Sequence, residues 1–129
     1  MRVKTKDLNG LALDWAVMSI EFKRLQEKGE YIKPWVLERH RGGDPCGAPS
    51  VLWAQCGPII EREGLNLQTS LGEWVASTPK AVEIDGGRKY CFASGHTPLV
   101  AAMRCYILSI LGDTVDIPDN LIEYTQYVN

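Results

Sequence analysis

The sequence has no run of about 20 apolar residues, which is the length that a helix needs to cross a bilayer. Its longest apolar segment, residues 98–111, is shorter and is interrupted by Arg104. The first ten residues, MRVKTKDLNG, are charged and contain no apolar core of the kind that secretory signals carry. We therefore expect no membrane segment and a location in the cytoplasm.

The chain also has little net charge, because 14 Lys and Arg stand against 16 Asp and Glu, which gives −2. No overall basic field draws it to nucleic acid, so we do not expect nucleic-acid binding. The charge is nevertheless uneven, since residues 113–129 hold four acidic side chains and no basic one. This polarity can steer docking or self-association, or it can be a solvated face.

Thiols and imidazoles are few and widely spaced. There is no Cys-x-x-Cys pair, and the separations among His40, Cys46 and Cys56 match no standard zinc site. We expect no metal, no cofactor and, in a reducing compartment, free thiols at Cys46, Cys56, Cys91 and Cys105. A small Cys/His-dependent enzyme would need His40 beside Cys56 or His96 beside Cys91, and no local signature supports either pair. An enzyme is therefore an alternative and not the first hypothesis.

A length of 129 residues fits a single domain, 1–129. Apolar residues at alternating spacings of three and four predict a long first helix from Lys6 to Lys28, with Thr5 as its N-cap and Gly29 as its C-terminal glycine. The stripe consists of Leu8, Leu11, Trp15, Met18, Phe22 and Leu25. Such a stripe is typical of a helix packed on its own sheet, and the alternative is a coiled-coil seam with a partner.

A loop insertion is predicted over residues 29–50. The run YIKPWVLERH favours β structure, and Pro34 confines any strand there to an edge. The run RGGDPCGAPS that follows is rich in Gly and Pro, as loops are. Arg39, His40 and Arg41 lie beside these glycines and can wrap an anionic ligand, although such a segment can also be a variable surface insertion.

Proline and glycine divide the middle of the chain. In WAQCGPIIEREGL, residues 53–65, Pro58 predicts the start of a short helix that Gly64 ends, after a separate turn capped by Ser50. Next, LNLQ, EWVAS and two segments joined by a glycine turn at 85–87 predict a small, mostly antiparallel sheet of three to four strands. Trp74 lies in its middle strand, where an aromatic side chain usually fills core volume.

The segment SGHTPLVAAMRCYILSILGD predicts a helix that Thr97 caps, Pro98 begins and Gly112 ends. Because this helix is apolar on nearly all sides, we expect it to be buried between the sheet and another element. After it we expect an edge strand near Val115 and an acidic tail over 119–129. The predicted fold class is therefore α+β, with a long N-terminal helix, a short middle helix and a buried C-terminal helix.

Arg104 is the one charged residue of that last helix. A buried guanidinium must reach water or find a partner. We predict a structural ion pair with Glu61 or Glu63, and the alternative is an arginine that binds an anion.

Four segments, MRVKTKDLNGLALDWAV, WAQCGPIIEREGL, EWVAS and SGHTPLVAAMRCYILSILGDTVDIP, span the chain in this order. Together they resemble the NinX-like family of accessory proteins of lambdoid phages and prophages. That family usually has two glycines before the proline of the second segment, and Cys56 replaces the first of them here. The resemblance implies a phage accessory protein in the bacterial cytoplasm with a helix, sheet, helix sandwich, and it transfers no catalytic residue.

The first hypothesis for function is a non-enzymatic binding module for a host protein or a small anionic molecule. Aromatic faces and guanidiniums together can stack on a base and hold a phosphate. The candidate ligand-binding residues are therefore Trp53, Gln55, Arg62, Trp74 and Arg104, unless both tryptophans are core. The alternative is a homo-oligomeric structural or interaction protein that pairs through the first helix or a sheet edge, for example as a homodimer.

Overall fold

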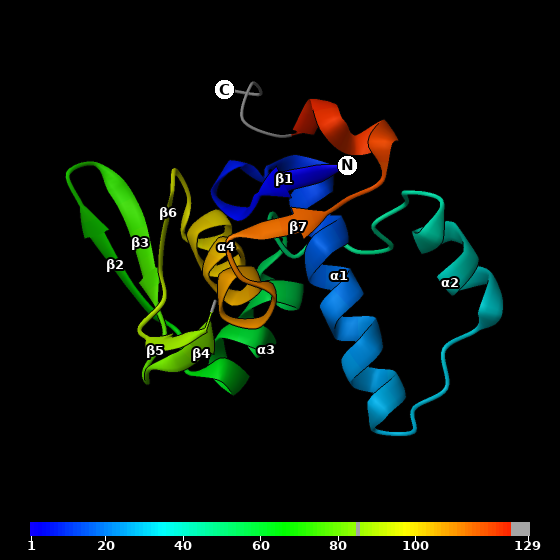
Figure 1. The fold of residues 1–129 in the computed structure, drawn as a ribbon, viewed down its shortest axis with the longest axis horizontal. Coiled ribbons are helices and arrows are strands. Elements are labelled where there is room, and N and C mark those ends of the chain that lie inside the picture. The colour runs from blue at the N-terminus through cyan, green and yellow to red at the C-terminus, as the bar shows by residue number, and fades with distance from the viewer. Residues whose placement is uncertain (85, 125–129) are drawn as a thin grey trace.

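The computed structural model describes residues 1–84 and 86–124. Helix α4 occupies the middle of the molecule, with a three-stranded sheet on one side and helix α1 on the other (Figure 1). The helices are α1 (Gly10–Glu27), α2 (Pro34–Arg41), α3 (Trp53–Glu63) and α4 (Pro98–Leu111), with 3-10 turns η1 (Thr5–Asp7) and η2 (Asp119–Tyr124). The α+β fold class is confirmed.

The strands form three small antiparallel sheets. The central one has the order β2-β3-β6 and consists of β2 (Asn66–Ser70), β3 (Glu73–Ser77) and β6 (Phe92–Gly95). The two others are pairs, β1 (Arg2–Lys4) with β7 (Thr114–Asp116) and β4 (Val82–Ile84) with β5 (Gly87–Lys89). The predicted hairpin around the glycine turn and the predicted strand near Val115 are both confirmed.

Helix α4 is capped as its sequence predicts. The Thr97 hydroxyl accepts a hydrogen bond from the amide of Val100 at 3.1 Å, Pro98 opens the helix, and Gly112 with φ +86° follows its end. The helix packs on β6 and β3 on one side and on α1 on the other. At Gly95 the backbone of β6 lies so close to α4 that an added Cβ would meet the amide of residue 101 at 2.8 Å. The buried position that its apolar circumference predicts is therefore confirmed.

Helix α1 begins at Gly10, so the prediction that Thr5 caps it is wrong. The Thr5 hydroxyl donates instead to the carbonyl of Gly112 at 2.6 Å, which joins the chain after β1 to the end of α4. At the other end Gly29 has φ +80°, as a C-terminal glycine should. The helix packs mainly on α4 and η2.

The predicted stripe of α1 is not its most buried face. That face consists of Ala12, Leu13, Ala16, Val17 and Ile20. Two stripe residues meet α2 instead, because the Trp15 ring stacks on His40 with 4.6 Å between centroids and Phe22 meets the same imidazole edge-on at 5.1 Å. The stripe therefore finds its partner within the same chain.

Residues 34–41 form helix α2, so the prediction of an edge strand there is wrong. Pro34 sits at the first helical position, where its missing N–H costs nothing. The loop predicted after it is present at residues 42–52, and side chains hold its backbone. The amide of Ser50 donates to the buried carboxylate of Asp14 at 2.8 Å.

Helix α3 runs unbroken through Pro58, so the prediction of a helix start at that residue is wrong. Pro58 lies in the second turn, where it leaves only the carbonyl four residues earlier without its helical donor. Gly57 precedes it, and a glycine has no Cβ to meet the proline ring. Gly64 has φ +66° and ends the helix, as predicted.

Strand β3 is the middle strand of its sheet, and Trp74 on it packs half-buried against the core, as predicted. The segment RKYCF does not form one strand but divides into the end of β5 and the start of β6. In the predicted acidic tail, residues 119–124 form η2, whose Leu121 is buried against the core. Residues 125–129 lie outside the described part of the chain.

Candidate functional site

A cleft of about 470 Å³ lies over α4, between β6 and the β1–β7 pair. Figure 1 shows α4 between these two sets of strands. The side facing β1 and β7 carries Lys4, Thr5, Lys6, Asp113 and Thr114, the β6 side carries Phe92, Ala93 and Ser94, and α4 contributes Arg104 and Leu108. The cleft therefore draws on segments from both ends of the chain.

Arg104 is fixed in this cleft by three neutral oxygens. Its Nε donates to the Leu8 carbonyl at 2.9 Å, Nη1 to the Ser94 carbonyl at 2.9 Å and Nη2 to Asn9 Oδ1 at 2.6 Å. The predicted ion pair with Glu61 or Glu63 is absent from the described residues, because α3 lies on another side of α4. Burial lowers the pKa of Arg104, and the charges of Asp7 and Glu73 only partly offset this.

The cleft is basic overall. Lys4, Lys6 and Arg104 carry positive charge, and Asp113 is the one acidic side chain in the lining. Within the described residues neither lysine has an ion-pair partner within 4.0 Å. Phe92, with 62% of its surface exposed, adds an aromatic ring at the rim. An anionic group with an apolar neighbour fits this combination of charge and aromatic surface.

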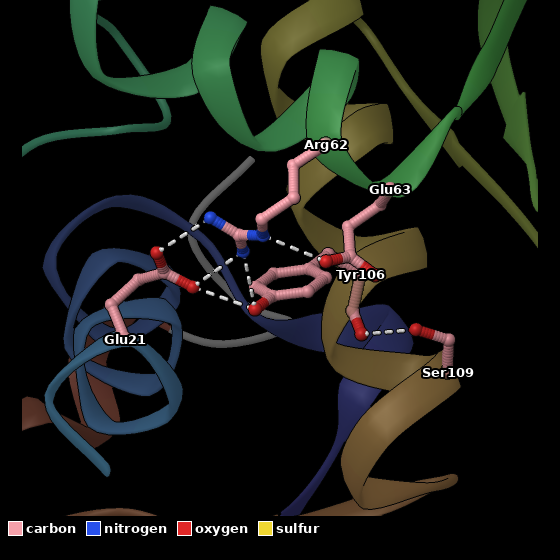
Figure 2. Close-up of polar contacts among 5 residues, drawn as sticks. All are labelled: Glu21, Arg62, Glu63, Tyr106 and Ser109. Atoms are coloured by element: carbon pink, nitrogen blue, oxygen red, sulfur yellow. Dashed lines mark hydrogen bonds and ion pairs between the residues drawn. The ribbon is translucent and has the colours of Figure 1, made fainter. Parts of the chain in front are cut away.

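Arg62 belongs to a different cluster, which joins three helices (Figure 2). Its Nη1 and Nη2 donate to the two oxygens of Glu21 on α1 at 3.2 and 3.0 Å, and its Nε donates to Glu63 at 2.8 Å. Tyr106 on α4 donates its hydroxyl proton to Glu21 at 2.6 Å and accepts from Arg62 at 2.9 Å. Burial opposes the charged guanidinium, but the hydrogen bonds to Glu63 and Glu21 outweigh it and raise the pKa of Arg62. Arg62 thus links α3 to both α1 and α4.

The other predicted ligand-binding residues lie apart from both clusters. Trp53 opens α3 and is 57% exposed, whereas Trp74 packs against the core from β3. Gln55 accepts a hydrogen bond from the amide of Ala48 at 2.7 Å and so supports the loop before α3. No hydrogen bond, ion pair or ring contact among the described residues joins any two of the five candidates. The structure places only Arg104 of this set in the cleft.

The three loop candidates lie at the end of α2, and each already has a partner. Arg39 pairs with Asp44 at 2.9 Å, and Arg41 pairs with Glu38 one turn earlier on α2. His40 is 8% exposed and is hydrogen-bonded through Nε2 to the Trp15 carbonyl at 3.1 Å. His40 therefore holds α2 against α1, Arg39 holds it to the loop, and Arg41 pairs within α2 itself.

The thiols are placed for packing. Cys56, Cys91 and Cys105 are buried, and Cys46 is half-buried. Burial raises the pKa of Cys56 and of Cys105 to about 12, and it also raises the pKa of the other two thiols. A raised pKa keeps these groups protonated near neutral pH, and the protonated thiol is a poor nucleophile.

Among the described residues, no three His, Cys, Asp or Glu side chains gather where they can hold a metal ion. No helix in the same part of the chain is both long and apolar enough to cross a membrane.

Sequence reasoning missed Lys4, Lys6, Phe92 and Ser94 as cleft residues. The two lysines alternate with other residues at the N-terminus, a pattern that is typical of a strand. No segment close in the sequence indicates which strand pairs with it. That partner is β7, more than one hundred residues later, in the register Lys4 with Thr114. Only the closed fold brings both lysines to Arg104.

Comparisons with known proteins give one family. A search of curated proteins finds no match to the chain. The family model described as "Bacteriophage P22, NinX" matches residues 4–110, which include α1 to α3, all but the last residue of α4, the central sheet and Arg104. Because that range is well over half of the sequence, the chain belongs to the phage NinX family.

Proposed function

We propose that this phage protein is a non-enzymatic binding module in the cytoplasm of the bacterial host, and that the cleft over α4 holds an anionic group of its ligand. The observation that carries the proposal is Arg104, a half-buried residue whose three hydrogen bonds go to neutral oxygens and whose pKa burial lowers. A poorly solvated cation without a direct carboxylate partner attracts an anion strongly.

The guanidinium is also held in advance of binding. Leu8, Asn9 and Ser94 come from two segments far apart in the sequence and fix three of the five N–H groups. The two remaining N–H groups, one on each terminal nitrogen, have no acceptor among the described residues. Little side-chain entropy is therefore lost when an anion binds to them.

The lysines and the size of the cleft support the same function. Lys4 and Lys6 are exposed, so they add attraction that weakens as the salt concentration rises. A volume of about 470 Å³ lies within the range of about 300–1,000 Å³ that is usual for small-ligand sites. The buried thiols, in contrast, offer no activated nucleophile for the enzyme alternative.

Inorganic pyrophosphate is a suitable probe, because it carries charge without an organic group. We expect it to shift the amide resonances of residues 4–6 and 92–95 in an NMR titration at low salt. The double variant Lys4→Gln/Lys6→Gln should bind it about tenfold more weakly, since loss of two exposed charges costs about 1.4 kcal/mol. The matched control Lys33→Gln/Lys80→Gln also removes two exposed lysines and should leave the affinity unchanged. Equal weakening in both variants, or no shifts at residues 92–95, would disprove the anion site.

A second candidate function is self-association. Three exposed apolar residues follow one another, Val51, Leu52 and Trp53, directly before and at the start of α3. Such a run is unusual on a surface that has no partner. The first-helix version of a homodimer is not favoured, because Trp15 and Phe22 of the α1 stripe already pack against His40 of α2. Light scattering tests this candidate: a dimer that Trp53→Glu converts to a monomer supports it, and a wild-type monomer at every concentration rejects it.

A further inference from the structure

The cleft borders a strand that is paired on one side only. Strand β6 pairs with β3, and the order β2-β3-β6 leaves its other edge without a neighbouring strand among the described residues. That edge supplies Phe92, Ala93 and Ser94 to the cleft. The β1–β7 pair across the cleft belongs to a separate sheet, so the ladder of hydrogen bonds is interrupted at this point.

The pairing with β3 determines which backbone groups of β6 face the cleft. Next to β6, the amide of Thr78 donates to the Cys91 carbonyl at 3.1 Å, so these two residues face each other in the ladder. In an antiparallel pair the residues alternate, and those at the intervening positions point their N–H and C=O away from the neighbour. Phe92 and Ser94 are the intervening residues. The backbone N–H and C=O groups of these two residues therefore point toward the cleft. The hydrogen bond from Arg104 to the Ser94 carbonyl at 2.9 Å agrees with this direction.

The edge of β6 lacks two of the features that usually protect an exposed strand edge. Its sequence, FASG, contains no proline and no charged side chain. The basic side chains stand around the edge instead, with Lys4 and Lys6 across the cleft and Arg104 on α4. A small anion can use these charges, but only an extended chain can also use a row of backbone donors and acceptors.

We propose that an extended, acidic peptide segment of a partner protein adds to the edge of β6 as a fourth strand, with its carboxylates facing Lys4, Lys6 and Arg104. This inference rests on the proposed function, because it names the class of ligand that the anion-binding cleft takes. The Phe92 and Ser94 amides donate to peptide carbonyls, and the Phe92 carbonyl accepts from a peptide amide. The exposed Phe92 ring packs against an apolar side chain of the peptide.

The test uses a hexapeptide of alternating glutamate and valine with both ends blocked. Its matched controls are the same peptide N-methylated at every residue, which has no backbone N–H to donate to a strand, and a peptide with lysine in place of glutamate. We expect the first peptide to bind and each control to bind at least about tenfold more weakly, a difference of about 1.4 kcal/mol. On saturation, hydrogen exchange of the Phe92 and Ser94 amides should slow by at least about tenfold.

Strand β2 is the internal control, because it is the other outer strand of the same sheet and its sequence, NLQTS, has no charge. Its amides should exchange at the same rate with and without peptide. Equal binding of the N-methylated peptide, unchanged exchange at Phe92 and Ser94, or protection of β2 instead would each overturn the inference. Protection of β6 that grows with protein concentration without peptide would assign the edge to a second copy of this chain and also overturn it.

The pyrophosphate titration separates this inference from the proposed function. If pyrophosphate binds in the cleft and the peptide does not, the anion site stands and the strand addition is rejected. If neither probe binds, both are rejected.

Discussion

The Glu21–Arg62 pair offers a direct test of how the helices are held together. The side chains are 16% and 28% exposed, and two hydrogen bonds of 3.2 and 3.0 Å join them. We consider the variants Glu21→Gln and Arg62→Met, which remove one charge each and keep most of the side-chain volume. Because Arg62 on α3 reaches Glu21 on α1 beside Tyr106 on α4, the pair acts on the packing of all three helices (Figure 2).

The expected magnitude follows from distance and exposure. Two charges about 4 Å apart interact by about 4 kcal/mol at an effective dielectric constant of about 20. Partial exposure and salt reduce this value, so we expect a coupling free energy of about 2 kcal/mol. Arg62→Met alone should lower the free energy of unfolding by about 2–3 kcal/mol, because it leaves the Glu21 carboxylate largely buried with Tyr106 as its remaining donor.

The assay is urea unfolding at neutral pH of the wild type, both single variants and the double variant, which gives the coupling directly. The control cycle uses the pair of Arg39 and Asp44, which has a similar distance of 2.9 Å but side chains that are 63% and 40% exposed. Its coupling should be below about 0.5 kcal/mol. Equal coupling in the two cycles would refute the reasoning, because burial would then make no difference.

Three further predictions concern pH, a buried carboxylate and a turn. Burial lowers the pKa of His40, so the unfolded chain binds the proton more tightly and stability should fall as the pH drops below about 6.5, by up to about 1.4 kcal/mol per unit. Urea titrations from pH 8 to 5 should show this slope in wild type and in the exposed-site control His96→Gln, but not in His40→Gln. Burial raises the pKa of Asp14, which means that its charged form is costly in the folded protein. Asp14→Asn keeps an acceptor for the Ser50 amide and should unfold at the same or a higher urea concentration than wild type at pH 7. Asp14→Ala removes the acceptor and should lower the free energy of unfolding by about 1–3 kcal/mol. Leu71 is fully exposed in the β2–β3 turn and has φ +52°, a conformation that asparagine adopts more easily than leucine. Leu71→Asn should therefore raise the free energy of unfolding by about 1 kcal/mol. An unchanged midpoint of thermal unfolding would show that the backbone at Leu71 is not strained.

Local signals in the sequence are sufficient to predict a helix when the residues that begin and end it are themselves recognisable. Thr97, Pro98 and Gly112 mark α4 correctly, because capping depends on residues within one turn. Pro34 also begins a helix, but Lys33 provides no side-chain cap and the aromatic and branched residues around the proline favour a strand, so local signals do not predict α2. At Pro58 a single lost hydrogen bond is outweighed by continuous packing of α3, with Cys56 and Ile59 buried.

The orientation of α1 and the partner of Arg104 could not be predicted from the sequence, because both depend on how elements distant in the chain pack. The spacing of apolar residues predicts the helix correctly. It places Trp15 and Phe22 on the core face, because these large apolar side chains belong to the stripe. The closest packing uses Ala12 and Ala16 instead, because small residues let α1 approach its neighbours, and the large ones are then covered by α2. Hydrophobicity alone does not distinguish these two faces.

The two arginines on the helices beside the core illustrate how context separates structure from function. Arg62 and Arg104 both donate three or more hydrogen bonds, but Arg62 binds carboxylates and Arg104 binds only neutral oxygens. A charge already neutralised within the fold gains little from a ligand, whereas a charge held by dipoles keeps its attraction for an anion. The sequence presents the two residues as equal candidates, and the difference arises because Glu21 lies beside α3 and no carboxylate lies in the same position beside Arg104. The proposed anion site therefore depends on which arginine lacks a directly bonded carboxylate and not on residue type.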